Sequence, residues 1–218
     1  RLKRYEEAIE SYNRTIELDD PTSYALLRIG KCHEKLGNKV LALKFFNKTV
    51  HEDPLLDKGW IAITDFYVRQ KNFQKALYYV NKALSIDNEN RFYWKRYATI
   101  NKEMNFFEEA EYGYRKAVEH GDFMLDTWLF WVDILQFLGE FESAIQTLLQ
   151  ASEYFPEEYE IEYRLAGLNL MLQETEKGKF HLSNALRLNF KNRMLLEHLF
   201  PVVWEMKLVQ KAIEKHSK

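Results

Sequence analysis

The chain has 218 residues and a formal net charge of −2, with 31 Lys and Arg against 33 Asp and Glu. Hydrophobic residues make up 46% of it, a share that is typical of folded proteins and excludes an intrinsically disordered chain. Only 8 Gly and 4 Pro are present, too few for the many tight turns of a fold built from short strands. We therefore predict an all-α protein.

Charge, hydropathy and cysteine content limit the partners that we expect. The nearly balanced charge argues against nucleic acid as a partner. No stretch approaches the roughly 20 apolar residues that cross a bilayer, so membrane insertion is not expected. One cysteine, Cys32, excludes an internal disulfide and suits a reducing compartment. The expected location is cytoplasmic, unless a signal precedes Arg1.

Small residues recur along the chain at a fixed interval of 34. One register is small in seven consecutive periods, at Ala8, Ala42, Ala76, Ala110, Ala144, Gly178 and Ala212. A second register follows seven residues later, at Thr15, Thr49, Ala83, Ala117, Ala151 and Ala185. Trp60, Trp94 and Trp128 keep the same interval. A fixed period of this length, without insertion or deletion, indicates a solenoid of repeated units.

Each period is predicted to be a hairpin of two helices. In residues 91–124 the apolar residues follow helical spacing in two blocks that are separated at Asn105. Gly37-Asn38 and Gly139 mark the same break elsewhere, because Gly suits a left-handed helix end and Asn suits an N-cap. The connections between hairpins are expected at Asp20-Pro21, Asp53-Pro54, Asn88 and Phe155-Pro156.

This pattern resembles the tetratricopeptide repeat (TPR) family, whose unit of 34 residues has a Trp, Leu, Gly, Tyr, Ala, Phe, Ala, Pro skeleton. Residues 57–90 match it at Trp60, Ile63, Thr64, Tyr67, Ala76, Val80, Ala83 and Asn88. Residues 23–56 match it at Leu26, Ile29, Gly30, His33, Ala42, Phe46, Thr49 and Pro54. The resemblance implies a right-handed α-solenoid of TPR helix-turn-helix hairpins, an α-α superhelix.

The register divides residues 1–218 into the parts of a single TPR array. Full repeats are expected at 23–56, 57–90, 91–124, 125–158 and 159–192. Residues 1–22 look like the second helix of a truncated repeat, so we expect the chain to be a fragment of a longer array. Residues 193–218 are expected to form a divergent C-terminal repeat or cap. There Phe200 replaces a small residue, and Pro201 interrupts a helix.

No cluster of residues suggests catalysis. The six histidines lie far apart, and none has a His or Cys partner at metal-ligand spacing. The glycines form no phosphate-binding loop. His33 occupies the Tyr position of its repeat, and we interpret both His33 and Cys32 as packed residues. We therefore predict no metal, no cofactor and no enzymatic activity.

The resemblance also implies where a ligand would bind. In TPR proteins the first helix of each repeat lines a concave groove. The peptide-binding groove is mapped to Tyr24, Arg28, Lys31, Lys58, Arg69, Phe92, Lys95, Arg96, Lys102, Phe130, Asp133, Phe137, Tyr163 and Arg164. Aromatic anchors beside Arg and Lys suit an extended or helical peptide. The predicted function is a non-catalytic protein-protein interaction scaffold that binds a peptide or protein segment.

Three alternatives stay open. In the first, the array is a substrate-positioning or regulatory arm of a larger enzyme whose catalytic part is absent from this chain. In the second, the predicted groove is a solvated inner face or is filled by the chain's own terminus. In the third, the array dimerises through an open end of the stack. The five-residue clamp with which co-chaperone TPR domains hold the C-terminal carboxylate of heat-shock chaperones is not expected, because only Lys95 and Arg164 match its positions.

Charge is uneven along the predicted groove. Residues 23–104 carry a net positive layer on the first helices, whereas Asp126 and Asp133 make the later repeats acidic. Such a gradient would orient a bound segment with its acidic part near Arg96 and its basic part near Asp133. The alternative is that these charges pair with one another between adjacent helices, for example Arg96 or Lys95 with Asp65, Asp126 or Asp133.

Overall fold

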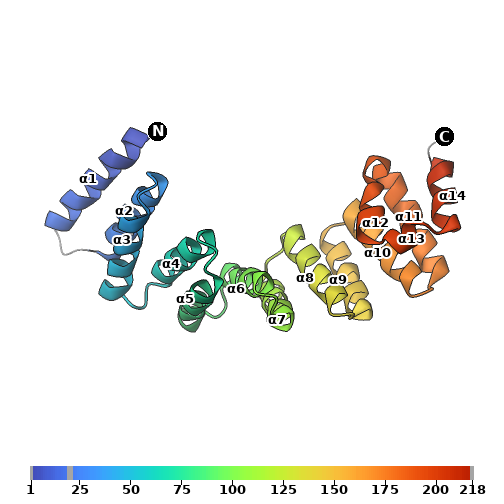
Figure 1. The fold of residues 1–218 in the computed structure, drawn as a ribbon, viewed down its shortest axis with the longest axis horizontal. Coiled ribbons are helices and arrows are strands. Elements are labelled where there is room, and N and C mark those ends of the chain that lie inside the picture. Colours follow the sequence, from blue (N-terminus) through green and yellow to red (C-terminus); the bar gives the residue numbers. More distant parts are fainter. Residues whose placement is uncertain (1, 19–21, 217–218) are drawn as a thin grey trace. The chain divides into compact units, whose positions relative to one another are not determined.

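The computed structural model describes residues 2–18 and 22–216, which contain fourteen α-helices, one short 3₁₀ helix and no strand (Figure 1). The predicted all-α fold of helical hairpins is confirmed. Within this described part, no helix is both long enough and apolar enough to cross a membrane. The turn predicted at Asp20-Pro21 lies outside the described residues.

The chain divides into two compact units, and the first contains three complete helical hairpins. This unit 1 spans Arg1–Asp122. Its helices are α1 (Leu2–Leu18), α2 (Ser23–Lys35), α3 (Lys39–Glu52), α4 (Asp57–Arg69), α5 (Phe73–Ile86), α6 (Arg91–Glu103) and α7 (Phe107–Glu119). The pairs α2/α3, α4/α5 and α6/α7 pack most extensively, and α1 packs on α2.

Unit 2 spans Phe123–Lys218. Its helices are α8 (Leu125–Phe137), α9 (Phe141–Tyr154), α10 (Tyr159–Met171), α11 (Thr175–Asn189), the 3₁₀ helix η1 (Phe190–Asn192), α12 (Met194–Leu199), α13 (Pro201–Trp204) and α14 (Lys207–His216). The sequence predicts one array over the whole chain, whereas packing groups the residues into two units. No change of composition at Asp122 signals this division.

One turn residue in each hairpin has a left-handed backbone conformation. Among the described residues these positions are Gly37, Lys71, Asn105, Gly139 and Gln173, with φ between 54° and 81°. They are spaced at the repeat interval, so the predicted breaks at Gly37, Asn105 and Gly139 are correct. Asn38 precedes α3, but its side chain makes no capping hydrogen bond, whereas the Asn72 side chain accepts one from the Lys75 amide.

The small residues of the repeat register are buried in the hairpins. Ala42, Ala76, Ala110 and Ala144 have no exposed surface. The second register is equally buried at Thr49, Ala83, Ala117, Ala151 and Ala185. The fixed interval therefore reports the positions at which space between the helices is smallest.

Lengthening one of these side chains should loosen its hairpin. Ala110→Leu is expected to lower the free energy of unfolding by about 1–3 kcal/mol, because the larger side chain has no space at this position. Urea unfolding followed by circular dichroism measures the change. Glu108→Leu, which places the same side chain at an exposed position of α7, is the control and should change stability by about 0.5 kcal/mol or less. Equal unfolding midpoints for Ala110→Leu and the parent chain would contradict the register.

Two of the repeated tryptophans hold a loop against a hairpin. The Trp60 and Trp94 indole N–H groups donate to the carbonyls of Pro54 and Asn88, at 2.8 and 2.7 Å. Both rings are half-buried, and Trp60 stacks on Tyr79. Trp128 is buried, and its indole nitrogen has no hydrogen-bond partner. These contacts agree with a structural role for the three side chains.

The last part of the chain departs from the hairpin pattern at Phe200. Pro201 ends the preceding helix and begins α13 at its first position, where a missing N–H costs little. The Phe200 ring is 3% exposed and lies against Gly167 of α10, where an added Cβ would be 2.2 Å from the ring. The α14 helix packs on α11. The terminal helices therefore cover part of α10.

Candidate interaction site

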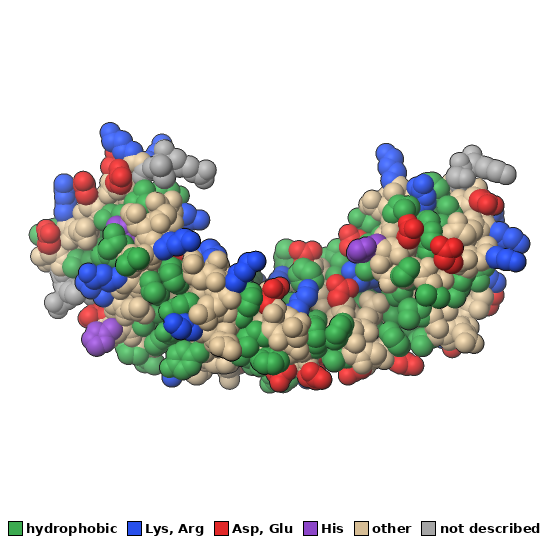
Figure 2. All heavy atoms as spheres, viewed as in Figure 1, with side chains coloured by type: hydrophobic (Ala, Val, Ile, Leu, Met, Phe, Trp, Pro, Cys, Tyr) green, Lys and Arg blue, Asp and Glu red, His purple; other side chains and the backbone are tan. Residues whose placement is uncertain are grey.

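A row of exposed basic side chains follows one face of α2. Tyr24, Arg28, Lys31 and Lys35 are four, three and four residues apart, which places them on one side of a helix. The helix begins at the Thr22 cap, whose hydroxyl accepts from the Ala25 amide, and its opposite side is buried. We call these four residues the α2 stripe. Lys and Arg side chains lie beside hydrophobic ones over unit 1 in Figure 2.

One basic residue of α4 extends the α2 stripe. The Lys58 ammonium lies 5.9 Å from the centre of the Tyr24 ring, within the range of a cation–π interaction. Tyr24 is 52% exposed. Within the described part of the chain, Arg28, Lys31, Lys35 and Lys58 form no ion pair. Four cations and one aromatic ring are thus presented to solvent together.

Two acidic residues of α2 and α4 are already paired. Arg69 of α4 forms an ion pair with Glu34 of α2. Arg96 of α6 forms another with Asp65 of α4, at 2.9 Å. Of the pairs that the sequence left as an alternative, Arg96 with Asp65 is therefore present. Because the Glu34 and Asp65 carboxylates are paired with Arg69 and Arg96, they do not compensate the cations of the α2 stripe.

The predicted residues of α6 lie in different environments. Phe92 is 59% exposed, and the Arg91 guanidinium lies 4.9 Å from its ring. The Lys95 ammonium lies 3.8 Å from the carboxylate of Asp122, which is buried. Lys102 is half-buried. On α6 the exposed Phe92 ring thus lies beside Arg91, whereas Lys95 is paired with an acidic side chain.

In unit 2 the predicted residues separate into an exposed and a buried group. Phe130 and Phe137 of α8 are exposed. Tyr163 and Arg164 of α10 are buried, in contrast to their predicted place on an open groove. Arg164 pairs with Asp133 of α8 at 2.5 Å. Because both side chains are buried, they are not available to a ligand.

The buried tyrosine has a hydrogen bond that fixes it in the fold. The Tyr163 hydroxyl donates to the backbone carbonyl of Asn189 at 3.0 Å. Burial raises the pKa of Tyr163 to about 12. The side chain therefore joins α10 to the end of α11 as a neutral phenol, which is a structural task.

The residues considered for chemistry at the sequence level are packed. Burial raises the pKa of the Cys32 thiol and lowers the pKa of His33, whose ring stacks on Phe45 with 5.4 Å between centroids. Within residues 2–18 and 22–216, no group of three His, Cys, Asp or Glu side chains is arranged to hold a metal ion. Cys32 and His33 therefore belong to the packing of α2.

One concave feature was missed by reasoning that followed the first helices only. A pocket of about 660 Å³ lies along α3 and the end of α4, lined in part by Lys39, Val40, Leu43, Lys44 and Phe66. Val40 is 83% exposed. The sequence contains a signal for this pocket: Val40 follows Lys39, and Lys44 and Lys48 lie four residues apart on one side of the same predicted helix.

Comparisons with known sequences give partial matches. A family model described as Tetratricopeptide repeat matches residues 1–56. ER membrane protein complex subunit 2 of Xenopus tropicalis is 22% identical over 111 residues, covering 50% of this chain and 37% of that protein. DnaJ homolog subfamily C member 7 of Homo sapiens is 29% identical over 97 residues, covering 38% and 19%. The chain thus corresponds to well under two thirds of these relatives.

Comparisons with solved structures cover most of the chain. YrrB, described as a TPR protein with an unusual peptide-binding site, has a TM-score of 0.72 at 18% identity and is matched over 88% of this chain and 98% of its own. PilF of Pseudomonas aeruginosa has a TM-score of 0.67 at 14% identity, with 90% and 89% covered. Similarity at these identities establishes the fold.

Proposed function

We propose that this chain, which belongs to the tetratricopeptide repeat family, is a non-catalytic scaffold that holds an acidic segment of a partner protein on α2 and α4. The fold is that of protein-interaction scaffolds. One observation carries the proposal: Lys58 lies beside the exposed Tyr24 ring, and Arg28, Lys31 and Lys35 follow Tyr24 along the same face of α2, all four cations without an ion pair among the described residues. Glu34 and Asp65 are paired with Arg69 and Arg96 instead.

The chemistry of this surface favours an acidic ligand over a neutral or basic one. Exposed cations attract a negatively charged segment, which raises the association rate and selects against basic segments. Tyr24 adds a partly apolar contact area that has a polar tip. A few anchors of this kind carry most of the energy at protein interfaces. We therefore place the acidic part of the ligand at the α2 stripe.

Pairing within the chain changes where the ligand's charges are expected. Arg96 faces Asp65, and Asp133 faces Arg164, so these four residues already satisfy one another. A bound segment gains less from a group whose charge is compensated. The proposed contact is consequently at Arg28 and Lys31 rather than at Arg96, and Asp133 is not proposed as a contact for basic residues.

The test is a selection from a displayed library of random peptides, followed by affinity measurements. We expect enrichment of segments that combine several Asp or Glu residues with one or two apolar residues. Arg28→Gln with Lys31→Gln should weaken binding of an enriched peptide about three- to thirtyfold, because two surface charge contacts of about 0.3–1 kcal/mol each are lost. Fluorescence anisotropy at two ionic strengths measures the change.

The control removes the same charge from a different surface. Lys211→Gln with Lys215→Gln changes two exposed lysines of α14 and should leave the affinity unchanged. Enrichment of basic or uncharged peptides would contradict the proposal. So would an equal loss of affinity in the two variants, because such a loss would report only the net charge of the protein.

A further inference from the structure

The pocket on α3 is chemically distinct from the α2 stripe and lies on the second helix of its hairpin. We call it the α3 pocket. Its apolar lining consists of Val40, Leu43 and Phe66, and its basic lining includes Lys39, Lys44 and Lys48. Leu43 is half-buried and packs against the core of unit 1, whereas Val40 is largely exposed. A partly exposed apolar strip thus lies beside Lys39 and the pair Lys44 and Lys48.

The charge of the α3 pocket has one sign. His51 adds a fourth basic side chain, and the remaining lining residues, Asn47 and Gln70, are uncharged amides. As far as the described residues extend, no Asp or Glu lines the pocket, and Lys39 and Lys44 form no ion pair. The Lys48 ammonium lies 5.5 Å from the Phe45 ring centre. A chain with a net charge of −2 therefore concentrates positive charge here.

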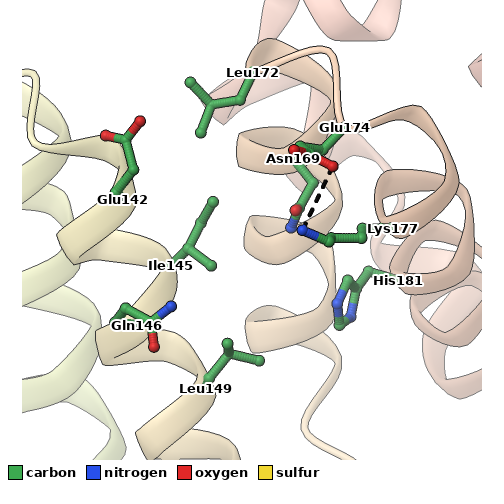
Figure 3. Close-up of a pocket in the computed structure, with 9 residues that line it drawn as sticks. All are labelled: Glu142, Ile145, Gln146, Leu149, Asn169, Leu172, Glu174, Lys177 and His181. Atoms are coloured by element: carbon green, nitrogen blue, oxygen red, sulfur yellow. Dashed lines mark ion pairs between the residues drawn. The ribbon is translucent and has the colours of Figure 1, made fainter.

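Unit 2 contains the same pocket position with different chemistry. A pocket of about 450 Å³ lies along α9 and faces α10 and α11 (Figure 3). Figure 3 shows Glu142, Ile145 and Gln146 of α9 on one side of it, at the positions that Val40, Leu43 and Lys44 occupy three repeats earlier. We call it the α9 pocket. Its lining carries both signs of charge, including a Glu174–Lys177 ion pair at 3.4 Å.

The two pockets share their place in the repeat but differ in their charged residues. Each unit has a hollow beside a second helix at the same register of the repeat. The apolar residue is retained at Leu43 and Ile145. The three lysines of α3, in contrast, correspond to Phe141, Gln146 and Gln150 of α9. The two pockets therefore share the hollow, but they do not share the lysines.

We propose that the α3 pocket docks an amphipathic helix of a partner protein, with acidic residues on both sides of an apolar row. The lining from Lys39 to His51 extends over about 18 Å of helix, which matches about twelve residues of a second helix laid alongside. Leucine-sized side chains of the partner contact Val40, Leu43 and Phe66. Its carboxylates pair with the surrounding lysines. This second site is independent of the α2 stripe.

The probe is a labelled synthetic helical peptide of about 14 residues, with Leu on one side and Glu on the flanking positions. A second peptide has Lys in place of Glu. The acidic peptide should bind the full chain and the Lys peptide should not, as measured by fluorescence anisotropy. In addition, two-dimensional NMR of the labelled chain should show the largest shift changes at residues 39–51.

Two variant pairs of identical charge test the site. Lys44→Gln with Lys48→Gln lowers the net charge by two, and so does Gln146→Glu with Gln150→Glu at the corresponding positions of α9. The first pair should weaken the acidic peptide about three- to thirtyfold and reduce the salt dependence of binding. The second pair should leave both unchanged. Arg28→Gln with Lys31→Gln should also leave both unchanged, which separates this site from the α2 stripe.

Several outcomes would overturn the proposal. Equal weakening in the two variant pairs would indicate unspecific attraction. Equal binding of the acidic and basic peptides would indicate a purely apolar contact. Shift changes on α2 instead of α3 would move the peptide to the other surface. Sedimentation of the chain with phosphatidylserine vesicles, without peptide binding, would assign the lysines to a membrane surface. Concentration-dependent dimerisation abolished by Lys44→Gln with Lys48→Gln would assign them to a second copy of the chain.

Discussion

Phe200→Ala is expected to lower the free energy of unfolding of unit 2 by about 3–5 kcal/mol, as a large-to-small change in a packed interior. Phe200 is 3% exposed, and its ring occupies the space above Gly167 of α10. Removing the ring leaves a cavity between α10 and the terminal helices. Hydrogen exchange measures the effect locally, and the amides of α10, α12 and α13 should lose protection while those of α2 to α5 keep theirs.

The opposite change at Gly167 tests the same contact. Gly167→Ala places a Cβ 2.2 Å from the Phe200 ring and should cost about 1–3 kcal/mol, although alanine favours a helix by about 1 kcal/mol. In the Phe200→Ala background the added methyl group enters the vacated space. Gly167→Ala should then stabilise the protein. Additive costs in the double variant would show that the two residues do not touch.

The hairpin architecture was predictable because the positions where two helices pack most closely accept only small residues. At Ala42, Ala76 and Ala110 a larger side chain does not fit between packed helices, so the sequence carries a small residue at each interval. Turn residues are a weaker signal. Glycine at positions 37 and 139 predicts a left-handed conformation. Lys71 and Gln173 adopt the same conformation, although neither residue type favours it. Only the repeat interval identifies these two.

The availability of the candidate site was less predictable. Register alone places Arg164 on the same face as Arg96, since the two residues hold the same position in different repeats. Arg96 is 40% exposed in its side chain and Arg164 is 7% exposed. Unit 2 has an additional feature: α12 and α13, which Pro201 separates, pack on α10. No local sequence pattern around Arg164 indicates packing by helices that begin 30 or more residues later in the chain.

Asp133→Ala is expected to destabilise unit 2 by about 3–5 kcal/mol, because it leaves the Arg164 guanidinium buried without a counter-charge. The Arg164 Nε already lacks a hydrogen-bond partner, so the Asp133 carboxylate is its main compensation. Arg164→Met should cost far less, about 1 kcal/mol. Methionine is similar in length and apolar, and the Asp133 side chain, which is 37% exposed, stays hydrated.

The double variant distinguishes a lost attraction from an uncompensated buried charge. Asp133→Ala with Arg164→Met should be more stable than Asp133→Ala alone, because the charge that needed the carboxylate is gone. Asp65→Ala is the matched control: Asp65 and Arg96 form the same pair two repeats earlier, but both side chains are partly exposed. Water can solvate Arg96, so this change should cost about 0–1 kcal/mol. Equal costs for Asp65→Ala and Asp133→Ala would contradict the difference in burial. Equal costs would also indicate that Arg164 is exposed to solvent and accessible to a ligand.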